Sequence, residues 1–250
     1  MLEVRGLTKD YKSFRAAEGV SFSVQTGEIV GLLGPNGAGK TTILRCCAGI
    51  LCPTHGNVLI DGHDIVLDQA RAKSALAYVP EVPSLYELLT VDEHLKFVAM
   101  CFDTVDMYET HGDALLDKYD LIEKKHNLVA TLSKGMRQKL AIACAMVHRA
   151  RVFLFDEPMI GIDPAGVAEF KREVTSAKES GCSILVSTHL LDTAERLCDK
   201  VVIMARGKVL AAGTLQELRD SQKMADADLE HVFLNLTEEA ESAPASLPPH

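Results

Sequence analysis

Gly34-Pro35-Asn36-Gly37-Ala38-Gly39-Lys40-Thr41-Thr42 lies between the apolar run Glu28–Leu33 and the segment Ile43-Leu44-Arg45. Its spacing matches G-x-x-x-x-G-K-[ST], and its neighbours predict a strand that enters a glycine-rich turn and a helix that leaves it. An ordinary strand-to-helix turn is the alternative, but such a turn needs no lysine and threonine at these two positions. The stretch therefore predicts a phosphate-binding loop in an α/β fold, and all of its residues are candidates for binding a nucleoside triphosphate.

Each residue type in this loop has a physical role. Gly34, Gly37 and Gly39 lack a Cβ, so the backbone can bend sharply and bring its N–H groups against phosphate oxygens. The positive end of the following helix dipole favours the same anion. Lys40 supplies a mobile positive charge for the outer phosphates, and the Thr41 hydroxyl is placed to ligate Mg²⁺.

A second cluster of functional side chains follows the apolar segment Val152–Phe155, which ends in Asp156-Glu157-Pro158. Alone, this pattern is more often a buried strand that runs into an acidic turn. Beside the Lys40 loop it predicts that Asp156 reaches the Mg²⁺ and that Glu157 polarises a water aimed at the γ-phosphate.

Composition limits the classes of protein that remain. The chain has 250 residues and a net charge of −9, which disfavours a nucleic-acid partner. Its seven cysteines include no C-x-x-C pair, so we expect reduced thiols, several of them buried, instead of disulfides or a zinc site. No apolar run approaches the roughly 20 residues of a membrane span, so we expect any membrane part to belong to another chain.

The periodicity predicts one domain over residues 1–237, built on a mixed β-sheet with early antiparallel strands. The pattern is mainly helical from about Val82 to Arg149, and we expect a helical subdomain over about residues 82–139. Within it, Thr90 caps a helix with Val91, Leu95, Val98 and Phe102 on one face. Two short helices are expected within about residues 215–236, and the acidic, proline-rich residues 238–250 are expected to be disordered. The other expected elements are strands over Leu2–Thr8, Val20–Val24, Ser183–Ser187 and Val201–Met204, a hairpin turn at Asp61-Gly62, and helices over Met107–Tyr119, Ser133–His148, Pro164–Ser180 and Leu190–Leu197.

Taken together, the motifs resemble those of the ATP-binding subunits of ABC transporters, over nearly the whole chain and in the same order. Gly34–Thr42 matches Walker A, and Asp156-Glu157 closes Walker B. Leu132-Ser133-Lys134-Gly135-Met136 lies where this family has its LSGGQ signature. The smaller matches are Tyr11 for the aromatic that stacks on adenine, Gly161-Ile162-Asp163-Pro164 for the D-loop and His189 for the switch histidine.

Two positions depart from the family pattern. The signature reads LSKGM, so Lys134 replaces a glycine and Met136 replaces a glutamine, whereas Ser133 and Gly135 are retained. Glu81 stands where the family has the glutamine of the Q-loop; its carboxylate can still ligate Mg²⁺ through oxygen but adds a negative charge. Both changes resemble a bacterial subgroup of ABC-2-type ATPases that includes Ecs-like and sodium-exporter subunits.

The resemblance implies a two-lobed α/β ATPase with a P-loop NTPase core, an antiparallel β subdomain and an inserted helical subdomain. It implies a head-to-tail dimer, with itself or with a second ATPase chain, in which two MgATP lie in the seam. Lys40, Thr41 and Asp156 would hold MgATP from one side, with Glu81 on the metal side, while Ser133 and Gly135 of the facing chain close over the γ-phosphate. The remaining expected roles are a water-activating base for Glu157, transition-state contact for His189, adenine stacking for Tyr11 and nucleotide contact for Asp163.

The same resemblance implies a partner and a location. A separate transmembrane permease would dock near the groove around Glu81–Tyr86 and carry out transport, for which we expect export. The chain would then lie at the cytoplasmic face of the membrane and touch it only through the permease.

Two alternatives remain. One is a soluble ABC ATPase that acts on nucleic acid or ribosomes; such chains usually carry a long coiled-coil insertion or a second cassette, and this sequence shows neither. The other is a regulatory subunit with little turnover, suggested by LSKGM and Glu81. Glu157 and His189 disfavour it.

Overall fold

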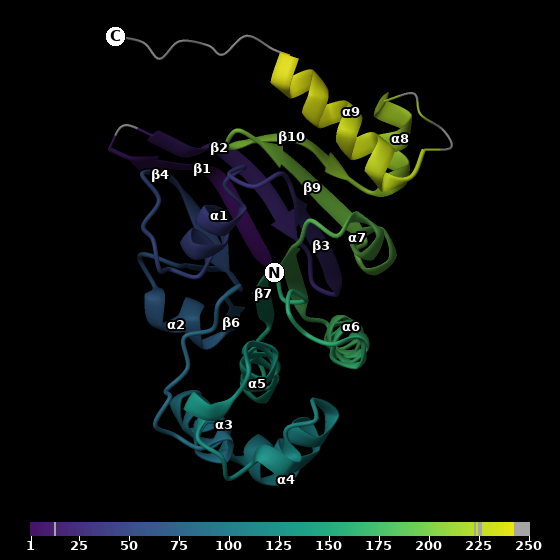
Figure 1. Cartoon of the computed structure of the whole chain (residues 1–250). Helices are drawn as coiled ribbons and strands as arrows, with labels where there is room; N and C mark the ends of the chain where they lie inside the picture. The colour runs from purple at the N-terminus through teal and green to yellow at the C-terminus, as the bar shows by residue number, and fades with distance from the viewer. Residues whose placement is uncertain (13, 223, 225–226, 243–250) are drawn as a thin grey trace.

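The computed structural model describes residues 1–12, 14–222, 224 and 227–242, and its strands form two sheets (Figure 1). The smaller sheet is antiparallel, with strands in the order β2-β1-β4-β5. Its strands are β1 Leu2–Tyr11, β2 Phe14–Val24, β4 His55–Ile60 and β5 His63–Asp64. The predicted hairpin turn between β4 and β5 is confirmed, because Asp61 and Gly62 have φ values of 48° and 84°.

The larger sheet is mixed and has six strands in the order β10-β9-β3-β8-β7-β6. All its neighbouring strands run parallel except β10, which pairs antiparallel with β9 at one edge. Its strands are β3 Glu28–Leu33, β6 Leu76–Val79, β7 Val152–Asp156, β8 Ser183–Ser187, β9 Lys200–Ala205 and β10 Lys208–Gly213. Because β3, β7 and β8 are parallel neighbours, their carboxyl ends meet at one edge, where the predicted site residues follow them.

Strand alternation divides the core into layers. Along β7, Phe153 and Phe155 pack in one cluster, whereas Val152 and Leu154 pack in another on the opposite face of the sheet. The second cluster includes Ile43 and Leu44 of α1 (Lys40–Cys47) together with residues of the antiparallel sheet. Helix α1, which begins in the phosphate loop, is therefore fixed between the two sheets.

The other face of the large sheet packs against the helical part of the chain, which we call the helical lobe. This part contains α3 Val91–Cys101, α4 Val105–Lys118, the 3₁₀ turns Ile122–Lys124 and Val129–Thr131, and α5 Lys134–Val147. Figure 1 shows α3 and α4 at the end of the molecule away from the antiparallel sheet. Apolar residues of α3, α4 and α5 share one buried cluster with β7, so α5 joins the helical lobe to the sheet.

The Thr90 cap is confirmed as a reciprocal capping box with Glu93. The predicted apolar face of α3 is only partly right. Val91 and Leu95 are buried, but Phe102 is exposed at the end of the helix, where its ring stacks on His148 with centroids 3.6 Å apart.

The remaining helices are α2 Gln69–Ser74, α6 Pro164–Glu179, α7 Leu191–Leu197, α8 Leu215–Gln222 and α9 Leu229–Ser242. Helix α9 packs with α7, α8, β9 and β10 around a third cluster that includes Leu33 and Val232. Because α9 continues to Ser242, the expected disorder from residue 238 is wrong up to that point; glutamate and alanine propagate a helix well. Residues 243–250 lie outside the described residues.

No helix among the described residues is long and apolar enough to cross a membrane. The seven cysteines are all free thiols, and Cys46, Cys47 and Cys144 are buried as expected. Cys52 and Cys101 are exposed.

Candidate functional site

The phosphate loop connects the end of β3 to the first residue of α1. Gly39 has a φ of 102°, and a Cβ at this position would overlap the carbonyl oxygen of Ala16. A Cβ on Gly34 would lie 2.5 Å from the carbonyl oxygen of Met204. Both positions need glycine because neighbouring backbone passes too close for any side chain. The loop is therefore held between β2 and β9.

Lys40 is the first residue of α1 and its side chain bends back over the loop. Its Nζ donates hydrogen bonds to the carbonyl oxygens of Gly34 at 2.6 Å and Pro35 at 3.3 Å. Burial lowers the pKa of Lys40, whereas the carboxylates of Glu157, Asp156 and Glu81 act in the opposite direction. These three carboxylates come from two segments, the end of β7 and the segment after β6, and they converge on the amine.

The predicted acidic pair ends β7. Asp156 is 1% exposed and its Oδ1 accepts a hydrogen bond from Ser187 Oγ at 2.6 Å. The backbone N–H of Glu157 donates to both the carbonyl oxygen and the Oγ of Ser187, each at 3.1 Å. Ser187 therefore holds both acidic residues. No local pattern in the sequence indicates this role, because it depends on the pairing of β7 with β8.

Glu157 has a φ of 48°, in the left-handed region that non-glycine residues seldom adopt. This backbone turn leaves its carboxylate beside His189, whose Nδ1 lies 3.0 Å from Glu157 Oε2. The Glu157 side chain is 9% exposed and that of His189 53%. The structure thus brings together the two residues predicted to be catalytic, in a strained arrangement typical of functional sites.

A cavity of about 240 Å³ lies over the phosphate loop. Its lining residues come from β2, the loop, the segment after β6 and the end of β7: Phe14, Ala16, Pro35, Asn36, Gly37, Ala38, Gly39, Lys40, Thr41, Thr42, Glu81 and Glu157. Most of the predicted nucleotide-binding residues, together with Glu81, therefore share one cavity. Phe14 and Ala16 were not predicted to belong to it.

Tyr11 does not line this cavity among the described residues. It ends β1, its β-sheet partner is Phe14, and Lys9 Nζ lies 5.4 Å from its ring centroid. Tyr11 is 41% exposed and Phe14 60%, and of these two paired aromatic residues only Phe14 lines the cavity.

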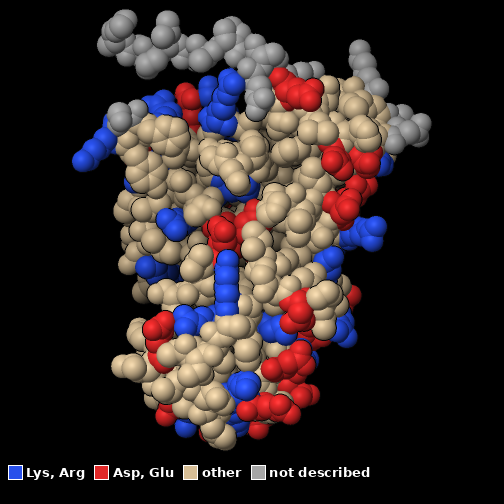
Figure 2. Space-filling model, in the orientation of Figure 1, with Lys and Arg blue, Asp and Glu red and all other residues tan. Residues whose placement is uncertain are grey.

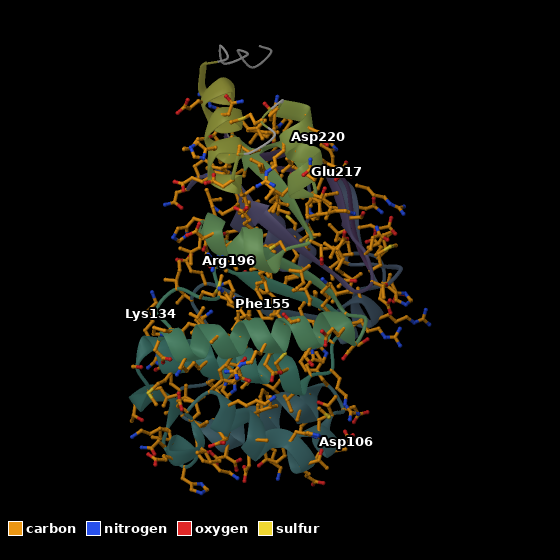
Figure 3. The ribbon with its side chains drawn as sticks, turned by 90° about the vertical axis from the view of Figure 1, so that its right-hand side faces the viewer. Asp106, Lys134, Phe155, Arg196, Glu217 and Asp220 are labelled. Carbon is orange, nitrogen blue, oxygen red and sulfur yellow. The ribbon has the colours of Figure 1, made fainter. Side chains whose placement is uncertain are left out.

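Ser133, Gly135 and Asp163 lie elsewhere, and none of them is in the described lining of the cavity. Ser133 is exposed and caps α5 by accepting a hydrogen bond from the Met136 N–H at 3.3 Å. Asp163 caps α6 in the same way, with Oδ1 2.8 Å from Gly166 N. Lys134, at the start of α5, is labelled in Figure 3. Within one chain these residues are not brought to the Lys40 cavity.

A second concavity, of about 480 Å³, lies between the segment after β6 and the helical lobe. We call it the apolar groove; its lining residues are Arg45, Ile50, Leu76, Ala77, Tyr78, Pro80, Val82, Pro83, Ser84, Leu85, His94, Val98, Phe102, Ala141, Cys144, Ala145 and His148. Ile50 and Val82 are 59% and 69% exposed. Because Glu81 lines the cavity and its neighbours Pro80 and Val82 line the groove, one short segment joins the two.

Comparison of the sequence with known proteins gives matches to ATP-binding proteins of ABC transporters. Residues 17–160 match the family model described as ABC transporter. The ABC-type transporter ATP-binding protein EcsA of Bacillus subtilis (strain 168) is 38% identical over 240 residues, which cover 96% of this chain and 97% of that protein. The probable multidrug ABC transporter ATP-binding protein YbhF of Escherichia coli (strain K12) is 35% identical over 94% of this chain and 41% of that protein.

A solved structure of the ATP-binding subunit of an ABC transporter superposes with a TM-score of 0.92. It is 37% identical and covers 95% of this chain and 99% of its own.

Proposed function

The chain belongs to the ABC transporter family as an ATP-binding subunit with ATPase activity, and we propose that it is the motor of an exporter. In this proposal two such chains close head to tail around two MgATP, and their closing and opening drive a separate transmembrane subunit. The observation that carries the proposal is the contact between Glu157 and His189 at the cavity that holds Lys40.

The reacting groups follow from this contact. As the oxygen of a water forms a bond to the γ-phosphorus, the bond from that phosphorus to the β–γ bridging oxygen breaks, and Glu157 accepts a proton from the water. His189 Nδ1 lies 3.0 Å from the carboxylate of Glu157, a residue that lines the cavity, and from there it would hold that carboxylate in place and contact the γ-phosphate. Lys40 and the backbone N–H groups of the loop bind the outer phosphates.

The oxygen donors around the cavity fit a magnesium ion. Thr41 and Glu81 line the cavity, and the buried carboxylate of Asp156 is close enough to influence Lys40 electrostatically. Hydroxyl and carboxylate oxygens are the ligands that Mg²⁺ takes in proteins, so these three residues would hold it. When bound, Mg²⁺ neutralises negative charge on the phosphate oxygens.

The position of Ser133 supports the dimer. Ser133 and Gly135 lie at the start of α5 and are not among the described residues that line the cavity. Only the Ser133 and Gly135 of a second chain could therefore cover an ATP bound at Lys40. The facing chain is a second copy or a related ATPase chain. Asp163, beside them at the start of α6, would face the same seam.

The apolar groove is the proposed docking site of the permease. Exposed apolar side chains there, including Ile50 and Val82, fit an apolar partner segment, and the Glu81 segment links the groove to the ATP cavity. Movement of Glu81 at the cavity would therefore move the wall of the groove. The chain would lie at the cytoplasmic face of the membrane through this contact. Export agrees with the multidrug description of YbhF.

The described part of the face in Figure 2 has lysine and arginine side chains interspersed with aspartate and glutamate. This distribution, with a net charge of −9, favours a protein partner over nucleic acid.

Light scattering after size exclusion tests the dimer. In a Glu157→Gln background, which keeps ATP bound, MgATP should convert monomers into dimers. Ser133→Arg should prevent this conversion because a bulky cation would block the seam, whereas Ser176→Arg, near the far end of α6, should not. A Glu157→Gln chain that remains monomeric at saturating MgATP, alone and with its membrane partner, would contradict the proposal.

A further inference from the structure

Lys139 is a buried lysine that the proposed mechanism does not use. It lies on α5 after the signature residues Ser133–Met136, and its side chain is only 6% exposed. Its Nζ is 2.6 Å from Asp163 Oδ2 and 3.3 Å from Asp120 Oδ2. Burying an ammonium group is costly unless it is paired, so these carboxylates fix where the lysine points.

Asp163 uses its two carboxylate oxygens for different partners. Oδ2 accepts from Lys139, while Oδ1 accepts from the Gly166 N–H at 2.8 Å and caps α6. The Lys139 hydrogen bond, followed by the Gly166 N–H, lowers the pKa of Asp163. The aspartate that begins α6 is therefore held by a side chain from α5.

The backbones of the two segments are also in close contact. A Cβ on Gly135 would overlap the carbonyl oxygen of Gly161. A Cβ on Gly166 would lie 2.7 Å from Lys139 Cε, so the stem of the lysine packs directly on the first turn of α6. The contacts at Gly135 and Gly166 and the ion pair thus join Ser133–Met136 to Gly161–Gly166.

We propose that Lys139 is a positioning residue that holds the segments Ser133–Met136 and Gly161–Gly166 as one rigid unit. Lys139 thereby fixes the orientation in which both segments approach the ATP bound by the facing chain. The inference rests on the proposed head-to-tail dimer. Lys139 does not line the Lys40 cavity, so its loss should leave the binding of ATP to its own chain intact. It should instead lower the turnover number, because the signature and Asp163 segments would no longer approach the partner's ATP in a fixed relation.

Two single variants and their combination test the ion pair. Lys139→Met keeps most of the packing on Gly166 but removes the charge, and Asp163→Asn keeps a cap for α6 but loses the charge. Each should lower the turnover number about tenfold or more while the Kd for ATP stays within about twofold. The double variant should be no slower than the slower single variant, because both changes break the same interaction.

Lys125→Met is the matched control. Lys125 also has two aspartate partners, Asp113 at 2.6 Å and Asp92 at 3.5 Å, but it lies in the helical lobe after α4. Its replacement should change turnover by less than about twofold. Thermal unfolding of every variant shows whether it is folded; if Lys139→Met is not, Lys139→Gln, which also removes the charge, takes its place.

Turnover within about twofold of wild type in a folded single variant would overturn the proposal. So would an ATP affinity that falls as much as turnover, or effects that multiply in the double variant. Failure of the dimer itself is recognised separately, because it would show as a monomeric Glu157→Gln chain with Lys139 intact.

Discussion

His189 Nδ1 lies 3.0 Å from Glu157 Oε2, and the contact joins the residues that follow two neighbouring strands, β7 and β8. Glu157 reaches this position through a backbone φ of 48°. Such a conformation costs of the order of 1–3 kcal/mol and persists only when its surroundings fix it. Ser187 supplies that support by accepting the Glu157 N–H with both its carbonyl oxygen and its Oγ.

Ser187→Ala should therefore lower both stability and turnover. The change removes the acceptor Oγ for the Glu157 N–H and the hydrogen bond to Asp156, so we expect a loss of about 1–3 kcal/mol in the free energy of unfolding. Ser183→Ala is the control on the same strand, because Ser183 Oγ is buried without a hydrogen-bond partner among the described residues. It should be neutral or stabilising. Equal effects of the two substitutions in denaturant unfolding and ATPase assays would contradict this role of Ser187.

Local patterns predicted most of the central structure. The glycine spacing before Lys40 and the apolar run before Asp156 each specify a strand end, and the parallel sheet brings both to one edge. Edge elements were harder to predict. The first half of β2 and all of β10 were missed, since Phe14–Gly19 has no clean alternation and β10 is a partly exposed edge strand with Ala211, Ala212 and Gly213.

Contacts between distant segments could not be read from the sequence. The carbonyl oxygen of Ala16 excludes a side chain at Gly39 only because β2, which pairs antiparallel with β1, passes close to the loop. Lys139 meets Asp163 only because α5 and the start of α6 lie side by side. No local spacing or periodicity in the sequence predicts either contact.

Gly39→Ala should damage the phosphate loop far more than Gly37→Ala. Both glycines have positive φ, so each substitution carries a backbone cost of about 1–2 kcal/mol. At Gly37 no atom lies within 4 Å of an added Cβ, whereas at Gly39 the Cβ would overlap the Ala16 carbonyl oxygen. We expect ATP affinity to fall more than about tenfold further in Gly39→Ala than in Gly37→Ala. Similar affinities in nucleotide titrations would show that the loop relaxes away from Ala16.

Glu81→Gln should leave ATP affinity nearly unchanged but alter the Mg²⁺ dependence of hydrolysis. Gln keeps one oxygen donor in the cavity and loses the negative charge, so more Mg²⁺ should be needed for half-maximal turnover. Stimulation by the membrane partner should also change, because the same segment walls the apolar groove. Mg²⁺ titrations of the reconstituted complex compare the two proteins. Superimposable curves with equal stimulation would argue against a metal-side role for Glu81.

Stability should fall as the pH drops from 7.5 to 5.5. Burial lowers the pKa of His94 and of His148, so the folded chain keeps both rings neutral. In the unfolded chain each histidine protonates near its usual value of about 6.5, so the unfolded state binds more protons below that pH and gains stability. The stability that the two neutral histidines contribute is fully present above about pH 6.5. It is lost as the pH falls towards their lowered pKa values in the folded chain.

Denaturant unfolding across this pH range measures the effect. His94→Gln should show a shallower loss of unfolding free energy than wild type, and His126→Gln, at an exposed position in the helical lobe, is the control substitution. An unchanged slope in His94→Gln would contradict the assignment of this histidine.

Steady-state ATP hydrolysis by Glu157→Gln, measured beside ATP binding by the same protein, tests the central claim most directly. The substitution removes the proposed proton acceptor and leaves the phosphate loop intact. We predict wild-type ATP affinity with turnover lowered by about 10²–10⁴-fold. Turnover within about twofold of wild type would contradict the assignment of Glu157 as the base.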